Sequence, residues 1–506
     1  MGVFGVLAGA AIWGCTSKPP ADPLLTLASR DEAAHTRLEA LKDVQAEAAT
    51  DPTVRTATQR VYRDIAWTAA EPAPVRLAVL NAMINDPDPA GAAQAKETCK
   101  LLLPRERSLA VVMYLSKIAA ERGWTDCVPS LIRSYSRTVA QVGWSGVEEE
   151  SERPERAAIE ALSGGKPVER VVFETFLNPP KLTETYGMDW AQRFRADAWD
   201  LLSRLDTDGS MRVKMISELP EQDADEAVRD IRECVKDLRA MPLTGEELKW
   251  LMALLDPKKK ANGQWWAQAT KAIAEVGDDG RVGVLNLRDA EAILWTGEHH
   301  PERLKASRAE LLSELRSRLA ERTIHERTAE SGKYRVPERL EHWESRLKWG
   351  DLISILAIDE AIRDKAVVSA LWTQAGLDRK DNTTEYGGVL MQRSALASTS
   401  GRLQQAEGEW IALLFPPRAG QRQGDERFVA SEDMVATSDL ALAHYHFHAQ
   451  KTKNSEFAGP SPGDLVYAAR SGRACVVVTT VGDGVMDADY YQPDGVVIDL
   501  GELGEK

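Results

Sequence analysis

The sequence predicts a protein in two parts: an N-terminal all-α array of helices, then a C-terminal α/β (α+β) domain with a mixed sheet. From residue 28 to residue 350 apolar residues recur at the helical spacing i, i+3, i+4, i+7. From residue 351 to residue 506 short β-type runs alternate with polar loops. The 506 residues are 43% hydrophobic and 28% charged, a globular composition long enough for two to four domains.

The first residues predict an export signal. The apolar run Val3–Cys15 is too short to span a bilayer, but it has the length of a signal-peptide core, and polar residues with prolines follow it. Residues 1–15 resemble a bacterial lipoprotein signal, with 16–27 as a linker. The resemblance implies that Cys15 is lipidated and that the chain is exported and anchored to an envelope membrane. The alternative is a buried N-terminal helix in a cytoplasmic protein.

The charge of the chain bears on its partners. The net charge is −15, and lysines and arginines form no concentrated stripe. Phosphate backbones attract basic surfaces, so we expect no nucleic-acid partner. An acidic chain is also poorly suited to adsorb on anionic lipid, so a lipid at Cys15 is the expected membrane attachment.

The helical region 28–350 is broken by short segments with Pro, Gly, Asp or Asn. Aspartates and prolines near several helix starts suit N-caps and first turns. Breaks recur about every 15 to 20 residues, so helix pairs follow roughly the period of HEAT-type repeats. The sequence therefore predicts a HEAT-like array that binds a protein partner or positions a substrate, with an irregular helical domain as the alternative.

Several residues of this region have two interpretations. His299, His300 and the Trp265–Trp266 pair suit a binding site, but they equally suit a core and a surface. The cysteines Cys99, Cys127, Cys234 and Cys475 form no CxxC pair, which disfavours a cysteine zinc site. Cys99 and Cys127 can bridge neighbouring helices in an exported protein, and all four can equally be buried thiols.

The C-terminal part begins with the apolar stretch 351–359, which can be an opening strand, and an amphipathic helix over 360–377. Further runs have β-type composition, bounded by polar loops. They are residues 386–392, 409–417, 427–430, 439–448, 474–482 and 495–500. Residues 351–506 together have the length of one domain.

Three histidines stand in the stretch HYHFH, residues 444–448. On a strand, alternation places His444, His446 and His448 on one face, with neighbours about 6.6 Å apart at Cα. Two imidazoles at that spacing can converge on one metal ion.

Further polar residues lie on either side of these histidines. Ser461 and Asp464 are three positions apart, so they can share one side of a loop-to-helix turn. Glu385 directly precedes a glycine-bearing strand, and a carboxylate there suits a general base. Ser461 can equally cap the turn together with Pro462.

The order of these residues resembles the JAMM/MPN metallopeptidase family. That pattern is a glutamate before a glycine-containing strand, then His-x-His, then Ser-x-x-Asp. It reads here as Glu385, then His446 and His448, then Ser461 and Asp464. The resemblance covers residues 351–506. Ala449 replaces the usual proline, and the twelve residues between His448 and Ser461 exceed the usual seven, as a polar insertion at the rim of the site.

The resemblance implies a zinc-dependent peptidase or isopeptidase. His446, His448 and Asp464 would bind Zn²⁺ with one position left for water, which is the catalytic pattern. Glu385 would act as general base, and Ser461 would donate a hydrogen bond to the oxyanion. His444 is extra, as a supporting residue or an alternative ligand. An envelope protein or peptide is the expected substrate. The alternative is an envelope-anchored scaffold whose MPN domain is catalytically silent and serves as a binding module.

Overall fold

The computed structural model describes residues 22–142, 144, 150–180, 190–277, 280, 282–328, 336–395, 408–425 and 427–504. Cys15 and the rest of the predicted signal segment lie outside these residues. The chain forms two compact units, the first ending at Val171 and the second beginning at Val172. The expected boundary at residues 350/351 lies inside the second unit, where the sheet and the helices that precede it form one body.

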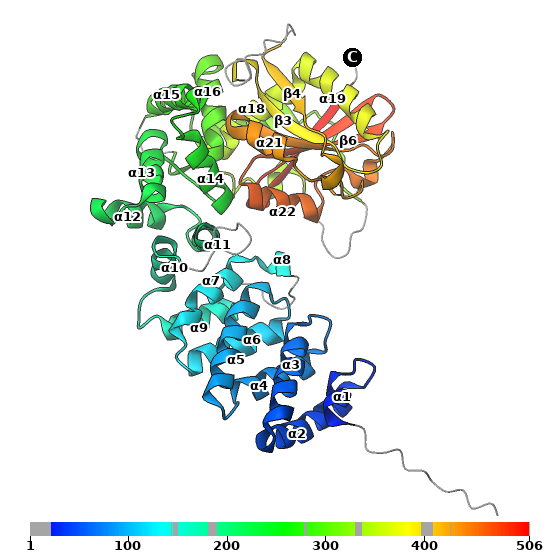
Figure 1. Ribbon diagram of the computed structural model, residues 1–506. Helices are drawn as coiled ribbons and strands as arrows, with labels where there is room; N and C mark the ends of the chain where they lie inside the picture. Colours follow the sequence, from blue (N-terminus) through cyan, green and yellow to red (C-terminus); the bar gives the residue numbers. More distant parts are fainter. Residues whose placement is uncertain are drawn as a thin grey trace, which may run out of the picture. The chain divides into compact units, whose positions relative to one another are not determined.

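The described residues of the first unit form a succession of helices (Figure 1). They are α1 (Pro23–Ala28), α2 (Ala34–Thr50), α3 (Pro52–Trp67), α4 (Ala73–Ile84), α5 (Pro89–Leu102), α6 (Leu109–Glu121), α7 (Val128–Ser136), α8 (Val139–Val142) and α9 (Pro154–Leu162), with α10 (Val168–Leu177) at the boundary. Asp51 and Asp88 cap α3 and α5 with their side chains, and each is followed by a proline at the first helical position. The aspartates before these prolines therefore act as N-caps, as predicted from the sequence.

A buried arginine recurs in the first unit at the fourth residue of a helix. Arg37 in α2 donates to the carbonyl of Leu27, 2.9 Å away, and pairs with Glu71 at 2.5 Å. Arg76 in α4 likewise donates to the carbonyl of Ala66, at 3.2 Å, and pairs with Glu106. Each arginine thus satisfies the end of the preceding helix and joins it to the start of a later one. The same contact thus recurs in two of the helices, α2 and α4.

The second unit contains further helices and two sheets. The helices are α11 (Trp190–Leu205), α12 (Ser210–Glu218), α13 (Glu226–Leu238), α14 (Gly245–Leu254), α15 (Lys260–Glu275), α16 (Ala290–His299), α17 (Arg308–Leu319), α18 (Trp349–Arg363), α19 (Lys365–Asp378), α21 (Glu432–Thr437) and α22 (Pro462–Ser471). The strands are β1 (Ala240–Met241), β2 (Leu285–Asn286), β3 (Gly387–Gln392), β4 (Trp410–Leu414), β5 (Ala443–His448), β6 (Cys475–Gly482), β7 (Val485–Tyr491) and β8 (Val497–Gly504). The pair β1–β2 is parallel and short.

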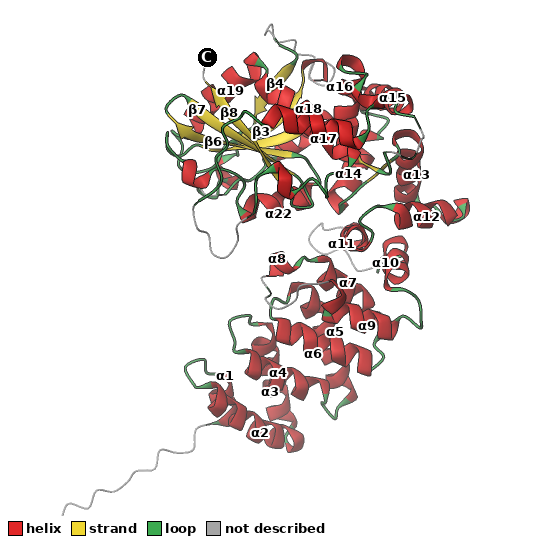
Figure 2. Cartoon of the chain, turned by 180° about the vertical axis from the view of Figure 1, so that it is seen from behind, coloured by secondary structure: helices red, strands yellow, loops and turns green. Residues whose placement is uncertain are grey.

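The larger sheet has the order β4-β3-β5-β6-β7-β8. Its strands are coloured yellow in Figure 2. Only the β5–β6 pair is parallel among these neighbours, and α22 lies in the connection between those two strands. On one face Cys475 and Val477 pack against Ala468 of α22. On the other face Tyr445 donates a hydrogen bond to Gln374 of α19. Helices therefore cover both faces, and the predicted mixed α/β sheet behind a helical part agrees with the structure.

Three sequence predictions in this part are wrong. Residues 351–359 belong to helix α18. The prediction of a strand was wrong because 352–358 are buried all round and almost entirely apolar, and such a stretch resembles a buried strand. The helix predicted over 360–377 is broken at Asp364, whose side chain caps α19. Residues 427–430 form no strand, and Phe428 stacks on His446 instead.

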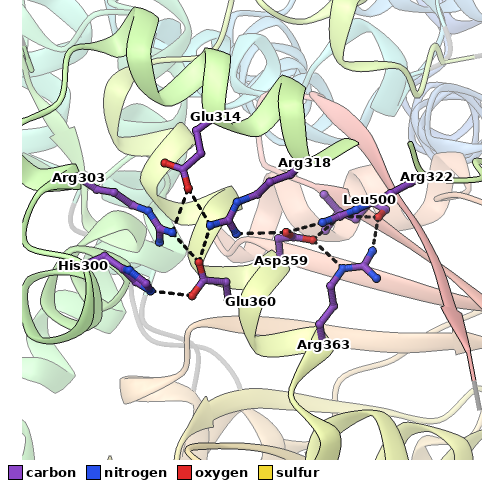
Figure 3. Close-up of polar contacts among 9 residues, drawn as sticks. All are labelled: His300, Arg303, Glu314, Arg318, Arg322, Asp359, Glu360, Arg363 and Leu500. Atoms are coloured by element: carbon purple, nitrogen blue, oxygen red, sulfur yellow. Dashed lines mark hydrogen bonds and ion pairs between the residues drawn. The ribbon is translucent and has the colours of Figure 1, made fainter. Parts of the chain in front are cut away.

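An ion-pair network fastens α17 and α18 to the sheet (Figure 3). Asp359 accepts hydrogen bonds from Arg322 at 2.5 Å and from Arg363 at 3.1 Å. Both arginines also donate to the backbone carbonyl of Leu500 in β8. Glu360, next in the chain, is bonded to His300, Arg303 and Arg318. The helices before the sheet are thus joined to it by charged hydrogen bonds as well as apolar packing.

Candidate metal centre

The pairing of β3 with β5 brings Glu385 beside the histidines. The strands are antiparallel, with Gly387 opposite His446, and the amide of Phe447 donates to the carbonyl of Tyr386 at 3.1 Å. This register continued by two residues places Glu385 opposite His448. Close approach requires glycine here: a Cβ at Gly387 would lie 2.3 Å from the Phe428 ring and 2.5 Å from the Tyr445 carbonyl oxygen.

The histidines share one face of β5, as the alternation predicts, while Tyr445 and Phe447 face the other way. His448 donates from Nδ1 to the carbonyl of Phe457, 2.9 Å away, because a carbonyl oxygen can only accept. This bond fixes the tautomer and leaves Nε2 of His448 with a free lone pair. Nε2 of His446 is buried and has no hydrogen-bond partner.

Asp464 faces both histidines from the first turn of α22. Its Oδ1 lies 3.3 Å from Nε2 of His446, and its Oδ2 lies 3.5 Å from Nε2 of His448. Two ligand atoms each about 2.1 Å from a tetrahedral ion are about 3.4 Å apart, so each separation by itself is close to that between two zinc ligands. The two separations involve different oxygens of Asp464, and the residues that bring one ligand atom each within 4.8 Å of one another are Glu385, His446 and His448. Burial by itself would raise the pKa of Asp464, but the two imidazoles hold that pKa well below its usual range.

Glu385 completes the cluster. One ligand atom from each of Glu385, His446 and His448 lies within 4.8 Å of the others. The four side chains are almost inaccessible, with 3% of Glu385, 1% of His446, 5% of His448 and 4% of Asp464 exposed. Burial, then the charge of Asp464, raises the pKa of Glu385 to about 9. A carboxylate there requires a compensating cation to stay ionised.

Ser461 is the N-cap of α22. Its Oγ accepts from the amide of Asp464 at 3.3 Å, and the amide of Ser461 donates to Oδ2 of Asp464 at 2.7 Å. This capping box, with Pro462 at the first helical position, aims the aspartate at the histidines. The hydroxyl of Ser461 accepts in this bond, so its proton is free to be donated elsewhere.

His444 lies farther along β5 and is engaged differently. Its Nδ1 is 2.7 Å from the hydroxyl of Tyr467 in α22. The structure thus places it beside the helix, one step along the face from the cluster of Glu385, His446 and His448.

Sequence reasoning missed the residues that hold His446 and His448 in place. The ring of Phe428 stacks on His446 with centroids 5.0 Å apart, and the hydroxyl of Tyr491 is 3.3 Å from Nδ1 of His446. The carbonyl of Phe457 lies in the insertion 449–460, which the sequence predicts to be a polar segment at the rim of the site. Lys451, Thr452 and Lys453 are exposed, but 458–460 are buried. No sequence signal marks these contacts, because each depends on segments far apart in the chain.

The other candidate residues have structural partners. Trp265 and Trp266 are buried, His299 is paired with Glu409 at 2.7 Å, and His300 with Glu360 at 2.9 Å. The cysteines of the described chain are free and buried; they are Cys99, Cys127, Cys234 and Cys475. These residues therefore serve packing and ion pairing.

Comparisons of the chain with protein-family models, with curated proteins and with solved structures gave no match. Within the described residues, no helix combines the length and the apolar character needed to cross a bilayer. The function is therefore argued from the side chains of the site.

Proposed function

We propose that the C-terminal part is a zinc-dependent peptidase or isopeptidase of the JAMM/MPN type. The observation that carries the proposal is the convergence of Asp464 on two buried imidazole nitrogens, one without a hydrogen-bond partner and one freed by its bond to Phe457. Such a nitrogen-and-oxygen donor set, with Glu385 adjacent, suits Zn²⁺. The HEAT-like helices would bind a protein partner or position the substrate. Export and lipidation at Cys15 are a separate proposal that rests on residues 1–15.

Each side chain of the site has a separate role in the proposed reaction. His446, His448 and Asp464 would bind Zn²⁺, which supplies Lewis acidity and lowers the pKa of water to about 7. Glu385 accepts a proton from the attacking water and delivers it to the leaving amine. Ser461 would donate a hydrogen bond from its hydroxyl to the oxyanion that forms at the attacked carbonyl. The burial of Glu385 excludes bulk water from this transfer.

The burial of the cluster favours one alternative. If Glu385 binds the ion as a fourth protein ligand, the site is closed, which is the structural rather than the catalytic pattern. Gln450 already covers this carboxylate, with its Nε2 3.4 Å from Oε1. The C-terminal part would then be a catalytically silent binding module on a helical scaffold.

Zinc stoichiometry tests the proposal on the purified chain. We expect about one zinc per chain in the wild type, none in His446→Ala/His448→Ala, and an unchanged content in the matched control His444→Gln. A folded wild-type chain without zinc would reject the peptidase.

Glu385→Gln separates the two functions. If Glu385 is the catalytic base, the variant keeps its zinc but no longer cleaves a peptide library that the wild type cleaves. If Glu385 is a fourth zinc ligand, the variant binds zinc more weakly, and the wild type cleaves no peptide in the library.

A further inference from the structure

A second polar cluster lies inside the sheet. Asp487 and Asp489 of β7 and Asp499 of β8 each place a carboxylate oxygen within 4.8 Å of the others. Asp489 is the register partner of Asp499, and Asp487 precedes it by two positions on the same face. Asp487 and Asp489 are 0% exposed and Asp499 is 2% exposed. Three carboxylates thus meet out of contact with bulk solvent.

Most of the oxygens in this cluster have no partner. Both oxygens of Asp487 and both of Asp489 are buried without a well-aligned hydrogen bond, although the amide of Gly459 lies near Asp489 and opposes the rise in its pKa. Thr479 of β6 is the register partner of Asp487 of β7. Its hydroxyl is also buried and also lacks a hydrogen-bond partner. Asp499 alone is satisfied, accepting from the amides of His325 at 2.7 Å and Gly501 at 2.6 Å. Folded proteins pair nearly all buried polar atoms, so such a group requires a ligand or a proton.

The surrounding charges do not neutralise the cluster. Glu338 is a fourth carboxyl group nearby. Burial, together with the negative charge of Asp499, raises the pKa of Glu338 to about 7. Arg327 directs its guanidinium to the carbonyls of Phe457 and Gly459, and Arg363 is bonded to Asp359. The charges of Arg363 and Arg339 act on Asp487 and Asp499, but no ion pair of the described residues reaches the three carboxylates.

We propose that Asp487, Asp489 and Asp499 bind a hard divalent cation, with Ca²⁺ as the preferred ion. All the donors are oxygens, which suit hard cations rather than the softer ions that imidazole binds. A dry cage made only of protein oxygens favours Ca²⁺ over Mg²⁺, because Mg²⁺ keeps several of its waters. The site is chemically distinct from the cluster of Glu385, His446 and His448 and needs no zinc.

The cation would stabilise the segment that orients His448. His446, Val477 and Asp489 are register partners across three neighbouring strands, so the two sites share one sheet face about 10 Å apart. Gly459 lies against the acidic cluster, since a Cβ there would be 2.2 Å from Oε1 of Glu338. Phe457, two residues earlier, provides the carbonyl that holds His448. Neutralising the carboxylates therefore fixes the insertion between the two sites.

Calcium binding to the full chain tests this inference. After removal of metals with EDTA, the wild type is titrated with Ca²⁺ alone and followed by equilibrium dialysis and thermal unfolding. We expect about one Ca²⁺ per chain and a rise in Tm of about 4 °C at a hundredfold excess over Kd. His446→Ala/His448→Ala should bind Ca²⁺ equally well, so failure of the zinc proposal and failure of this one are distinguishable.

Variants assign the binding to the cluster. Asp487→Asn/Asp489→Asn should lose the bound Ca²⁺ and the rise in Tm, whereas Asp483→Asn, in the exposed turn between β6 and β7, should keep both. Asn has the shape of a protonated Asp, so the double variant should fold without metal. If the double variant does not fold, Asp489→Asn is measured instead, and its affinity for Ca²⁺ should be at least about tenfold lower than that of the wild type.

The opposite results overturn the inference. A wild type that neither binds Ca²⁺ nor gains stability from it, or a double variant that still binds it, shows that the carboxyls share protons instead.

Discussion

Gly387→Ala should destabilise the sheet and displace the candidate site together. The added Cβ would lie 2.3 Å from Cε2 of Phe428 and 2.5 Å from the carbonyl oxygen of Tyr445. Ordinary contact begins at 3.4 Å, so the carbonyl must retreat by about 0.9 Å, and that carbonyl belongs to the backbone of β5. Overpacking of this kind costs about 1–3 kcal/mol, and we expect a loss near the upper end because backbone has to move.

The assay is urea unfolding of the full chain followed by tryptophan fluorescence, with the zinc dissociation constant measured in parallel. For the proposed zinc site we expect binding to weaken about tenfold, because Glu385 lies two residues before β3 and Phe428 stacks on His446. Gly376→Ala is the matched control, since a Cβ there meets nothing within 4 Å and Ala favours the helix. Equal stability of Gly387→Ala and the wild type would refute the steric reasoning.

Three further predictions concern stability. Ser461→Ala should cost about 1 kcal/mol by removing the N-cap of α22, while Ser461→Asp should retain the cap, as measured by thermal unfolding. Glu106→Gln should cost about 3 kcal/mol in the first unit because it leaves Arg76 buried and unpaired, and Glu106→Gln/Arg76→Met should recover much of the loss in calorimetry. Burial raises the pKa of Glu291 to about 7, so the folded chain binds this proton more tightly than the unfolded chain. Its contribution is complete below about pH 4 and is lost as the pH rises through 7, by up to about 3 kcal/mol. Glu291→Gln should flatten this dependence when unfolding free energies at pH 5 and pH 8 are compared; an unchanged slope would contradict the assignment.

The strand β7 shows why part of the fold escaped sequence reasoning. Asp487 and Asp489 interrupt its apolar pattern, although both are completely buried. The turn before it carried a usable signal, because Asp483-Gly484 separates the paired residues Gly482 and Val485, and Asp-Gly favours two-residue hairpins. Residues 351–359 of helix α18 were predicted as a strand for the opposite reason: 352–358 are all buried and, apart from Ser354, apolar, so their spacing gave no indication of a helix.

Local pattern by itself determined the helical N-terminal part, most strands of the sheet, and the alternation that places His446 and His448 on one face. Those features depend on the spacing of neighbouring residues along the chain, which the sequence displays directly. Only the tertiary structure decided that Glu385 lies opposite His448 and that the carbonyl of Phe457 selects the tautomer of His448. It also decided that Asp487, Asp489 and Asp499 share one buried volume. These relations depend on strand register and loop packing, which join residues distant in sequence through contacts that no local period encodes.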